Sequence, residues 1–149
     1  MMKRTIAFAA VAGLIGLGAI QLIPYGRDHA NPPVFMVAEP KWDSPATRAT
    51  AVSACYDCHS NQTQWPWYSN IAPMSWLIQH DVDEGRARLN FSTWGSSSGG
   101  ERENPVEAVR EGGMPPFIYT LTHPNANFTD TQRTAFIDGL TATFGGGGD

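Results

Sequence analysis

The chain has 149 residues, of which 42% are hydrophobic and 16% are charged, and its formal net charge is -4. This length accommodates one small domain with extensions, but not two domains of ordinary size. The mildly acidic balance provides no basic surface of the kind that nucleic acids require, so we expect no nucleic-acid partner.

The chain begins with a short basic segment that is followed by a long apolar one. Lys3 and Arg4 precede Ile6 to Ile23, which is apolar apart from Gln21. As a helix this stretch would reach roughly 27 Å, close to the roughly 30 Å hydrocarbon core of a bilayer. A cleaved signal peptide and a retained anchor both fit, but this length and the lack of a small-residue cleavage site favour a transmembrane anchor over residues 1–25. Because basic flanks stay cytoplasmic, both alternatives deliver the rest of the chain outside the cytoplasm.

The segment after the anchor is expected to be an extended tether, or a segment that wraps around the domain that follows it. Residues 26–43 are polar and contain three prolines, which favours an extended conformation. We expect the domain itself over residues 44–144, and a disordered glycine-rich tail over residues 145–149. The stretch from Ser92 to Gly100 is rich in glycine and serine and is expected to be a flexible loop.

Capping patterns mark the starts of three predicted helices, and apolar spacing predicts a fourth. Ser44 and Pro45 begin a helix that is expected to run into residues 55–59, and Asn104 with Pro105 repeats this start. Thr129 and Gln132 form a capping-box pattern before the last helix. A further helix is predicted over residues 73–89, and a proline-rich loop from residue 114 to the last helix. Since no run alternates as a strand would, the expected fold is all-α, with short helices and long loops.

The only two cysteines carry the clearest chemical signal in the chain. Cys55, Cys58 and His59 form Cys-x-x-Cys-His, the attachment signature of a c-type haem, in which each sulfur forms a thioether with a vinyl group and the histidine is an axial iron ligand. The alternatives are a disulfide, a thioredoxin-like redox pair, or a zinc site with His80 or His123 as the fourth ligand. We expect one covalently bound haem c, which also supplies the buried surface that long loops lack.

The second axial ligand is predicted to be Met114, on a proline-stiffened loop before the last helix. A methionine sulfur at this position would raise the reduction potential of the iron. His123 is the alternative and would produce a bis-histidine haem of lower potential. Several aromatic residues are expected either to wall the haem or simply to form the core. They are Trp65, Trp67, Tyr68, Trp76, Phe91 and Trp94.

Three blocks of this sequence resemble a bacterial family of membrane-anchored, single-haem c-type cytochromes, the haem-binding-domain family. The blocks run from Ala54 to Ser60, from Trp65 to Pro73, and from Met114 to Pro124, which includes Tyr119. The resemblance extends roughly over residues 20–140 and includes Asn31 with its two following prolines. It implies a small cytochrome c-like domain that faces the periplasm and is held at the inner membrane.

The function that we expect from these features is one-electron transfer by a carrier that is not an enzyme, since no nucleophile and base occur together. Redox proteins are the expected partners, including a membrane-bound electron-transfer complex. The alternatives are a haem-based sensor of small ligands or a peroxidase-like domain, and a haem-containing accessory subunit that stabilises a membrane complex.

Overall fold

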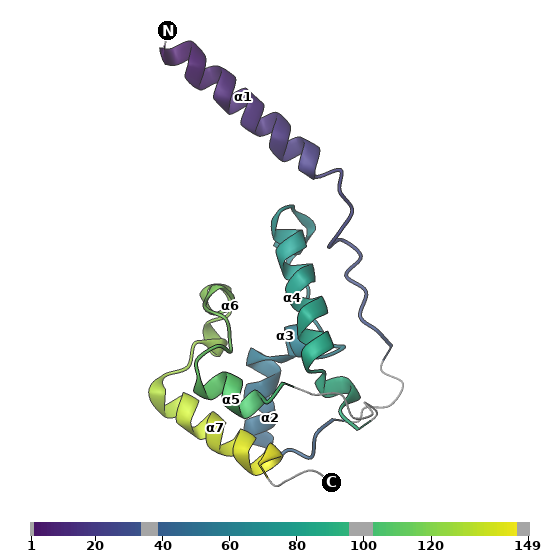
Figure 1. Cartoon of the computed structure of the whole chain (residues 1–149), viewed down its shortest axis with the longest axis vertical. Coiled ribbons are helices and arrows are strands. Elements are labelled where there is room, and N and C mark those ends of the chain that lie inside the picture. The colour runs from purple at the N-terminus through teal and green to yellow at the C-terminus, as the bar shows by residue number, and fades with distance from the viewer. Residues whose placement is uncertain (1, 34–38, 96–102, 146–149) are drawn as a thin grey trace.

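The computed structural model describes residues 2–33, 39–95 and 103–145, and every regular element in these ranges is helical, which confirms the all-α prediction. A long N-terminal helix projects from a group of shorter helices (Figure 1). The α-helices are α1 (Met2–Ile20), α2 (Pro45–Ala54), α3 (Tyr56–His59), α4 (Met74–Arg88), α5 (Pro105–Arg110), α6 (Phe117–Thr122) and α7 (Asp130–Phe144). Three 3-10 turns accompany them, η1 (Trp67–Asn70), η2 (Phe91–Thr93) and η3 (Pro124–Ala126). Most of the predicted Gly/Ser loop and of the predicted tail lies outside the described residues.

Helix α1 projects away from the other helices, and none of its residues is buried (Figure 1). Its 19 residues make it long and apolar enough to cross a membrane by length and composition. A signal sequence has the same properties. The structure therefore shows a helix of membrane-spanning length in the predicted place.

The three helix starts that were predicted from capping patterns are confirmed. The Ser44 side chain accepts a hydrogen bond from the backbone N–H of Thr47 at 3.1 Å, and Pro45 occupies the first turn of α2. Asn104 caps α5 in the same way. Thr129 and Gln132 form a complete capping box at the start of α7. Each side chain satisfies a backbone donor that the first helical turn leaves without a partner.

Two local predictions are wrong. The helix from Pro45 does not continue through the cysteine motif, because it ends at Ala54 and a separate turn of helix begins at Tyr56, with Cys55 at the break (φ -128°, ψ -33°). The segment after Pro116 is not a loop, since α6 forms there. Helix α6 has no side-chain cap, and its hydroxyl- and ring-bearing residues have low helix propensity. Tertiary contacts, described below for Tyr119, hold it instead.

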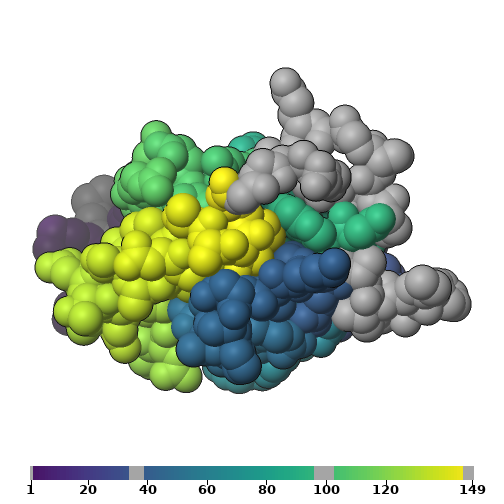
Figure 2. Space-filling view, turned by 90° about the horizontal axis from the view of Figure 1, so that it is seen from below, coloured from purple at the N-terminus to yellow at the C-terminus, as the bar shows by residue number. Residues whose placement is uncertain are grey.

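The core lies where α2, α3, α5 and α7 meet η2, and Phe91 is at its centre. The Phe91 ring is 1% exposed and lies 5.5 Å from Tyr56 and 5.4 Å from Trp42, measured between ring centroids. Seen from below, α7 extends across this end of the molecule beside α2 (Figure 2). Gly139 permits this approach, because a Cβ there would collide with the side chain of Thr47.

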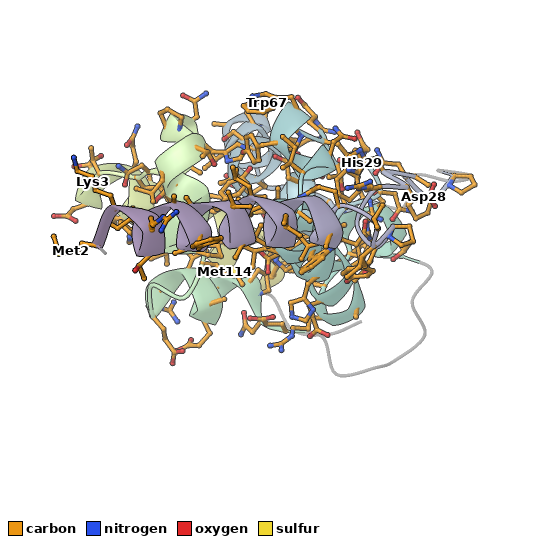
Figure 3. The ribbon with its side chains drawn as sticks, turned by 90° about the horizontal axis from the view of Figure 1, so that it is seen from above. Met2, Lys3, Asp28, His29, Trp67 and Met114 are labelled. Carbon is orange, nitrogen blue, oxygen red and sulfur yellow. The ribbon has the colours of Figure 1, made fainter. Side chains whose placement is uncertain are left out.

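The segment after α1 is fastened to the domain rather than free of it. The Gln21 side chain donates to the carbonyl of Ala72 at 2.9 Å and accepts from the Ala72 N–H at 3.0 Å. The His29 ring stacks on Trp65 with centroids 4.7 Å apart, and its Nε2 donates to the carbonyls of Gly26 and Ser69. Figure 3 shows His29 beyond the C-terminal end of α1, away from Met2 and Lys3 at the free end.

Candidate functional site

The cysteine motif lies at the junction of α2 and α3, where the backbone turns sharply. The Cys55 N–H completes α2 by donating to the carbonyl of Ala51 at 2.8 Å, and the Cys55 carbonyl accepts from the N–H of His59 at 2.8 Å. A single helical turn therefore carries both sulfurs and the histidine. Cys55 and Cys58 are free thiols, not bonded to each other, and both line one cavity of about 290 Å³.

His59 is buried, and its ring is held in one orientation by the C-terminal turn of α4. Its Nδ1 lies 3.0 Å from the carbonyl oxygen of Gly85 and 3.1 Å from that of Leu89. Both partners only accept hydrogen bonds, so Nδ1 carries the proton and Nε2 keeps its lone pair. A histidine whose second nitrogen donates to a backbone carbonyl is the usual arrangement of a metal-ligating histidine.

Gly85 makes this arrangement possible, and sequence analysis did not single it out. A Cβ at this position would lie 2.6 Å from the carbonyl oxygen of Cys58, so only glycine lets α4 approach the motif this closely. The same residue supplies a carbonyl to His59 Nδ1. The available signal was a glycine inside a predicted helix, which often marks a close packing contact.

Met114 lines the same cavity as the two cysteines and His59. Its position follows from the end of α5, where Gly112 adopts a φ of +76° that glycine tolerates without strain. The chain then turns back, and the Met114 N–H donates to the carbonyl of Ala108 at 3.0 Å. The structure therefore brings together four of the predicted site residues, which are separated by up to 59 positions.

His123 lies in a different hollow, of about 160 Å³, between α4 and α6. It is not among the residues that line the first cavity. Its ring stacks on Tyr119, with centroids 3.8 Å apart and planes 6° from parallel, and its Nδ1 donates to the Tyr119 carbonyl at 3.0 Å. Its Nε2 is 3.8 Å from a carboxylate oxygen of Asp57. His123 is thus engaged by Tyr119 and Asp57, and His59 is not among the residues that line its hollow.

The two hollows adjoin each other, since Tyr119, Cys58 and Asp81 line both. The Tyr119 hydroxyl donates to Asp57 at 2.8 Å, and Asp57 also accepts from the backbone N–H of Gln64 at 2.9 Å. Asp57 is one of the two variable residues of the cysteine motif, so this contact ties α6 directly to the motif. Burial, with the charge and hydrogen bond of Asp57, raises the pKa of Tyr119 above its ordinary value near 10.

Of the predicted aromatic residues, Phe91 lines the first cavity, whereas Trp94 and the four that follow are not among its lining residues. Trp65 stacks on His29, Trp67 is 76% exposed, and Tyr68 lines the second hollow. Trp76 lies on α4, and within the described residues its buried indole Nε1 has no hydrogen-bond partner. For these four and Trp94, contact with a haem stays a prediction to which the cavity lining adds no support.

The thiols have the character of buried, neutral groups. Burial raises the pKa of Cys55 to about 12, with a smaller contribution from Cys58. Burial also raises the pKa of Cys58 to about 12, with contributions from Asp81 and Asp57. A thioredoxin-like nucleophile needs a lowered pKa instead. Residues 2–33, 39–95 and 103–145 contain no group of three histidine, cysteine or acidic residues placed to hold a metal ion, so the zinc alternative gains no support.

These residues fit a haem. A cavity with mostly apolar walls carries two neutral thiols on one turn, and beside them a histidine with a fixed tautomer and a lone pair on Nε2. Fold and cavity together define a small all-helical protein built around a cysteine, histidine and methionine site. The sequence model of the haem-binding domain family matches residues 15–142, and the chain therefore belongs to this family and is a haem-binding protein. Neither the curated proteins nor the solved structures that were searched contain a match to the chain.

Proposed function

We propose that this protein is a periplasm-facing, single-haem c-type cytochrome that transfers one electron at a time at the inner membrane. The observation that carries the proposal is the shared cavity of Cys55, Cys58, His59 and Met114. The family match supports a haem, and the Cys-x-x-Cys-His spacing supports its covalent attachment.

The chain offers distinct roles to these four residues. Cys55 and Cys58 would each hold the haem through a thioether, and His59 Nε2 would be one axial ligand. Met114 is the methionine that lines the cavity, and its sulfur is the proposed second axial ligand. Bound haem supplies an iron that alternates between the ferrous and ferric states.

The surroundings of His59 and Met114 tune such a site. The two carbonyls that accept from His59 Nδ1 fix the ring and make Nε2 a stronger donor to a metal. Buried apolar side chains, among them Phe136 and Leu140, form part of the cavity wall. A thioether ligand and an apolar wall would both raise the reduction potential of bound haem.

Arg86 and Arg88 both lie in the last turn of α4, but only Arg88 lines the cavity, where it would be available to a haem carboxylate. Arg86 donates to the carbonyl of Ser60, to Asn31 and to Thr63, at 2.8 to 2.9 Å. Arg88 lines the cavity, and its ion pair with Glu84 is long, at 3.3 Å, and solvent-exposed. Exposed pairs of this kind are weak and exchange partners readily.

Location follows from α1. We infer that this helix stays in the inner membrane, with Lys3 and Arg4 on the cytoplasmic side and the haem domain in the periplasm. The anchored domain would exchange electrons with redox proteins that reach it from the periplasm or lie beside it in the same membrane. The hydrogen bonds of Gln21 and His29 to the domain limit its distance from the membrane.

The test is whether porphyrin remains on the denatured chain. Full-length protein, produced with a haem-attachment system and extracted in detergent, is expected to show the mass of the polypeptide plus one haem after acid-acetone treatment. A Cys55→Ala, Cys58→Ala variant should show the bare polypeptide mass. Bare mass for the unaltered protein would contradict covalent attachment. Ready binding of carbon monoxide to the ferrous protein would contradict a six-coordinate electron carrier and favour a ligand-binding function.

A further inference from the structure

A group of exposed apolar side chains lies on two neighbouring parts of the domain, η1 with the first half of α4, and α6. We call it the apolar face. Phe117 and Trp67 are 77% and 76% exposed, which is unusual for large aromatic residues. Its seven residues are Trp67, Ile71, Met74, Leu77, Phe117, Ile118 and Leu121. They belong to one surface because Met74 and Leu77 of α4 border the same hollow as Ile118 and Leu121 of α6.

The two segments that carry the apolar face have no formal charge. Residues 61–79 and 112–129 contain no Asp, Glu, Lys or Arg, although the chain has 14 acidic and 10 basic residues. The carboxylates near them, Asp57 and Asp81, line the hollow between the two segments. A neutral surface with an exposed tryptophan fits the lipid interface, where amphipathic rings lie at the headgroup level.

The apolar face lies directly where α1 ends. Gln21, the residue after α1, makes two hydrogen bonds to the backbone of Ala72, between Ile71 and Met74. Gly26, with a φ of +77°, packs so closely on the carbonyl of Ser75 that no Cβ would fit there. Figure 1 shows α6 and the N-terminal end of α4 on the side of the domain toward which α1 leaves. In the view from above, Trp67 lies to one side of α1 and Met114 to the other (Figure 3).

We propose that the apolar face rests on the lipid surface of the membrane that α1 enters. The inference rests on the proposed membrane anchor. If α1 lies in lipid, the contacts of Gln21 keep Ala72 and its apolar neighbours next to the bilayer surface. The face then enters the boundary between headgroups and acyl chains, to a depth of about 5–10 Å.

Such a contact gives the haem domain one orientation instead of a free range around its tether. The cavity would keep a constant height above the membrane. The charged residues of α5 and of the C-terminal half of α4, such as Glu84, Arg88 and Glu107, would remain in water. Partners would therefore reach the domain along the membrane plane or from the aqueous side, but not through the apolar face.

The experiment is lipid photo-crosslinking of the full-length, haem-loaded protein in vesicles of phosphatidylethanolamine and phosphatidylglycerol. Three variants each carry benzoylphenylalanine at one position, Leu121 in the apolar face, Val11 in α1, or Thr134 on α7. Thr134 is the matched control, because it is exposed and helical but lies on α7, which makes no contact with α6 in the described part of the chain. Mass spectrometry after illumination identifies each adduct. We expect phospholipid adducts at positions 11 and 121 in similar yield, and none above background at position 134.

The outcomes separate this inference from the anchor on which it rests. Lipid adducts at position 11 without any at position 121 would overturn the apolar contact and leave the anchor intact. No lipid adduct at position 11 would overturn both. A protein adduct at position 121 that appears only in native membranes would also overturn the proposal, in favour of a protein partner. Phe117 serves as a second position if the Leu121 variant does not load haem, which its optical spectrum reports.

Discussion

The two hollows that adjoin at Tyr119 differ in the chemistry that they offer to a metal. The first contains His59, with its Nδ1 bound to two carbonyls, and Met114 with its thioether. The second contains His123, whose ring is already stacked on Tyr119 and close to Asp57. Both candidates for the second axial position follow the cysteine motif at plausible distances along the chain. Their separation in space, which spacing does not reveal, favours Met114.

Removal of the Met114 sulfur is the change with the largest expected effect. In Met114→Ala the near-infrared band of methionine-ligated ferric haem should disappear. The reduction potential should fall by on the order of 0.1–0.2 V, because the thioether no longer favours ferrous iron. Absorption spectroscopy and redox titration of the detergent-extracted protein measure both.

Met74→Ala is the matched control for this change, because Met74 is the methionine of the second hollow. It should leave the near-infrared band and the potential as they are. A ferric near-infrared spectrum of the bis-histidine type, unchanged in Met114→Ala but altered in His123→Ala, would move the axial ligand to the second hollow and refute the assignment.

Gly85→Ala should be the most destabilising of the conservative changes near the first hollow. In an exposed helix interior this substitution stabilises by up to about 1 kcal/mol. Here the new Cβ would lie 2.6 Å from the Cys58 carbonyl oxygen, so we expect the opposite sign, a loss of about 1–3 kcal/mol. Urea unfolding of the haem-loaded protein, followed by haem absorbance, measures the free energy of unfolding.

Gly113→Ala is the control for Gly85→Ala, since its Cβ would meet only the Ala108 carbonyl, at an ordinary 3.6 Å. It should be neutral or stabilise by up to about 1 kcal/mol. If the two substitutions changed the free energy of unfolding equally, then α4 would not pack as closely on the cysteine motif as the structure shows.

Sequence reasoning found what short-range patterns encode. Ser44, Asn104 and Thr129 predicted three helix starts correctly, because a capping side chain and the backbone N–H that it accepts from lie within three residues of each other. The Cys-x-x-Cys-His motif is local in the same way, since Cys55, Cys58 and His59 lie on about one turn of the chain and line one cavity; its role as a haem attachment site stays a prediction.

Features that depend on long-range packing were not predicted. The role of Gly85 arises from contact with Cys58, 27 positions earlier, and α6 is held through Tyr119 by Asp57, 62 positions away. The docking of the segment after α1 through Gln21 and Ala72 spans 51 positions. Local propensities contain no information on such contacts, so the sequence left open whether residues 26–43 are an extended tether or wrap around the domain.

Tyr119→Phe tests the wall that the two hollows share. It removes the hydrogen bond to Asp57 and should cost about 1–1.5 kcal/mol of unfolding free energy near neutral pH. The folded pKa of Tyr119 is raised, mainly by burial, so the unfolded chain releases this proton first as the pH rises above about 10. The stability advantage of the unaltered protein should therefore be complete below pH 10 and shrink above it.

Tyr25→Phe provides the matched comparison, because Tyr25 also donates to an aspartate, Asp83, but at 3.3 Å and on the surface. Its loss should change the unfolding free energy by less than about 0.5 kcal/mol. Urea titrations from pH 7 to pH 11 measure both variants. A difference for Tyr119→Phe that stays constant across this range would contradict the coupling of the Tyr119 proton to folding.

His123→Gln is expected to have the smallest effect on the free energy of unfolding and on the reduction potential. This small effect would distinguish the second hollow from the first. The His123 Nε2 lies 3.8 Å from Asp57, both side chains are partly solvent-exposed, and the two form an ion pair only while His123 is protonated. Such pairs contribute about 0–1 kcal/mol, and glutamine retains part of the packing on Tyr119. We expect a change below about 1 kcal/mol in unfolding free energy, and an unchanged reduction potential.

A structural histidine at the edge of α6 can lose its ring without consequence for the iron, whereas an axial ligand cannot. A potential that moves with His123→Gln as far as with Met114→Ala would therefore mean that the hollows are not chemically separate.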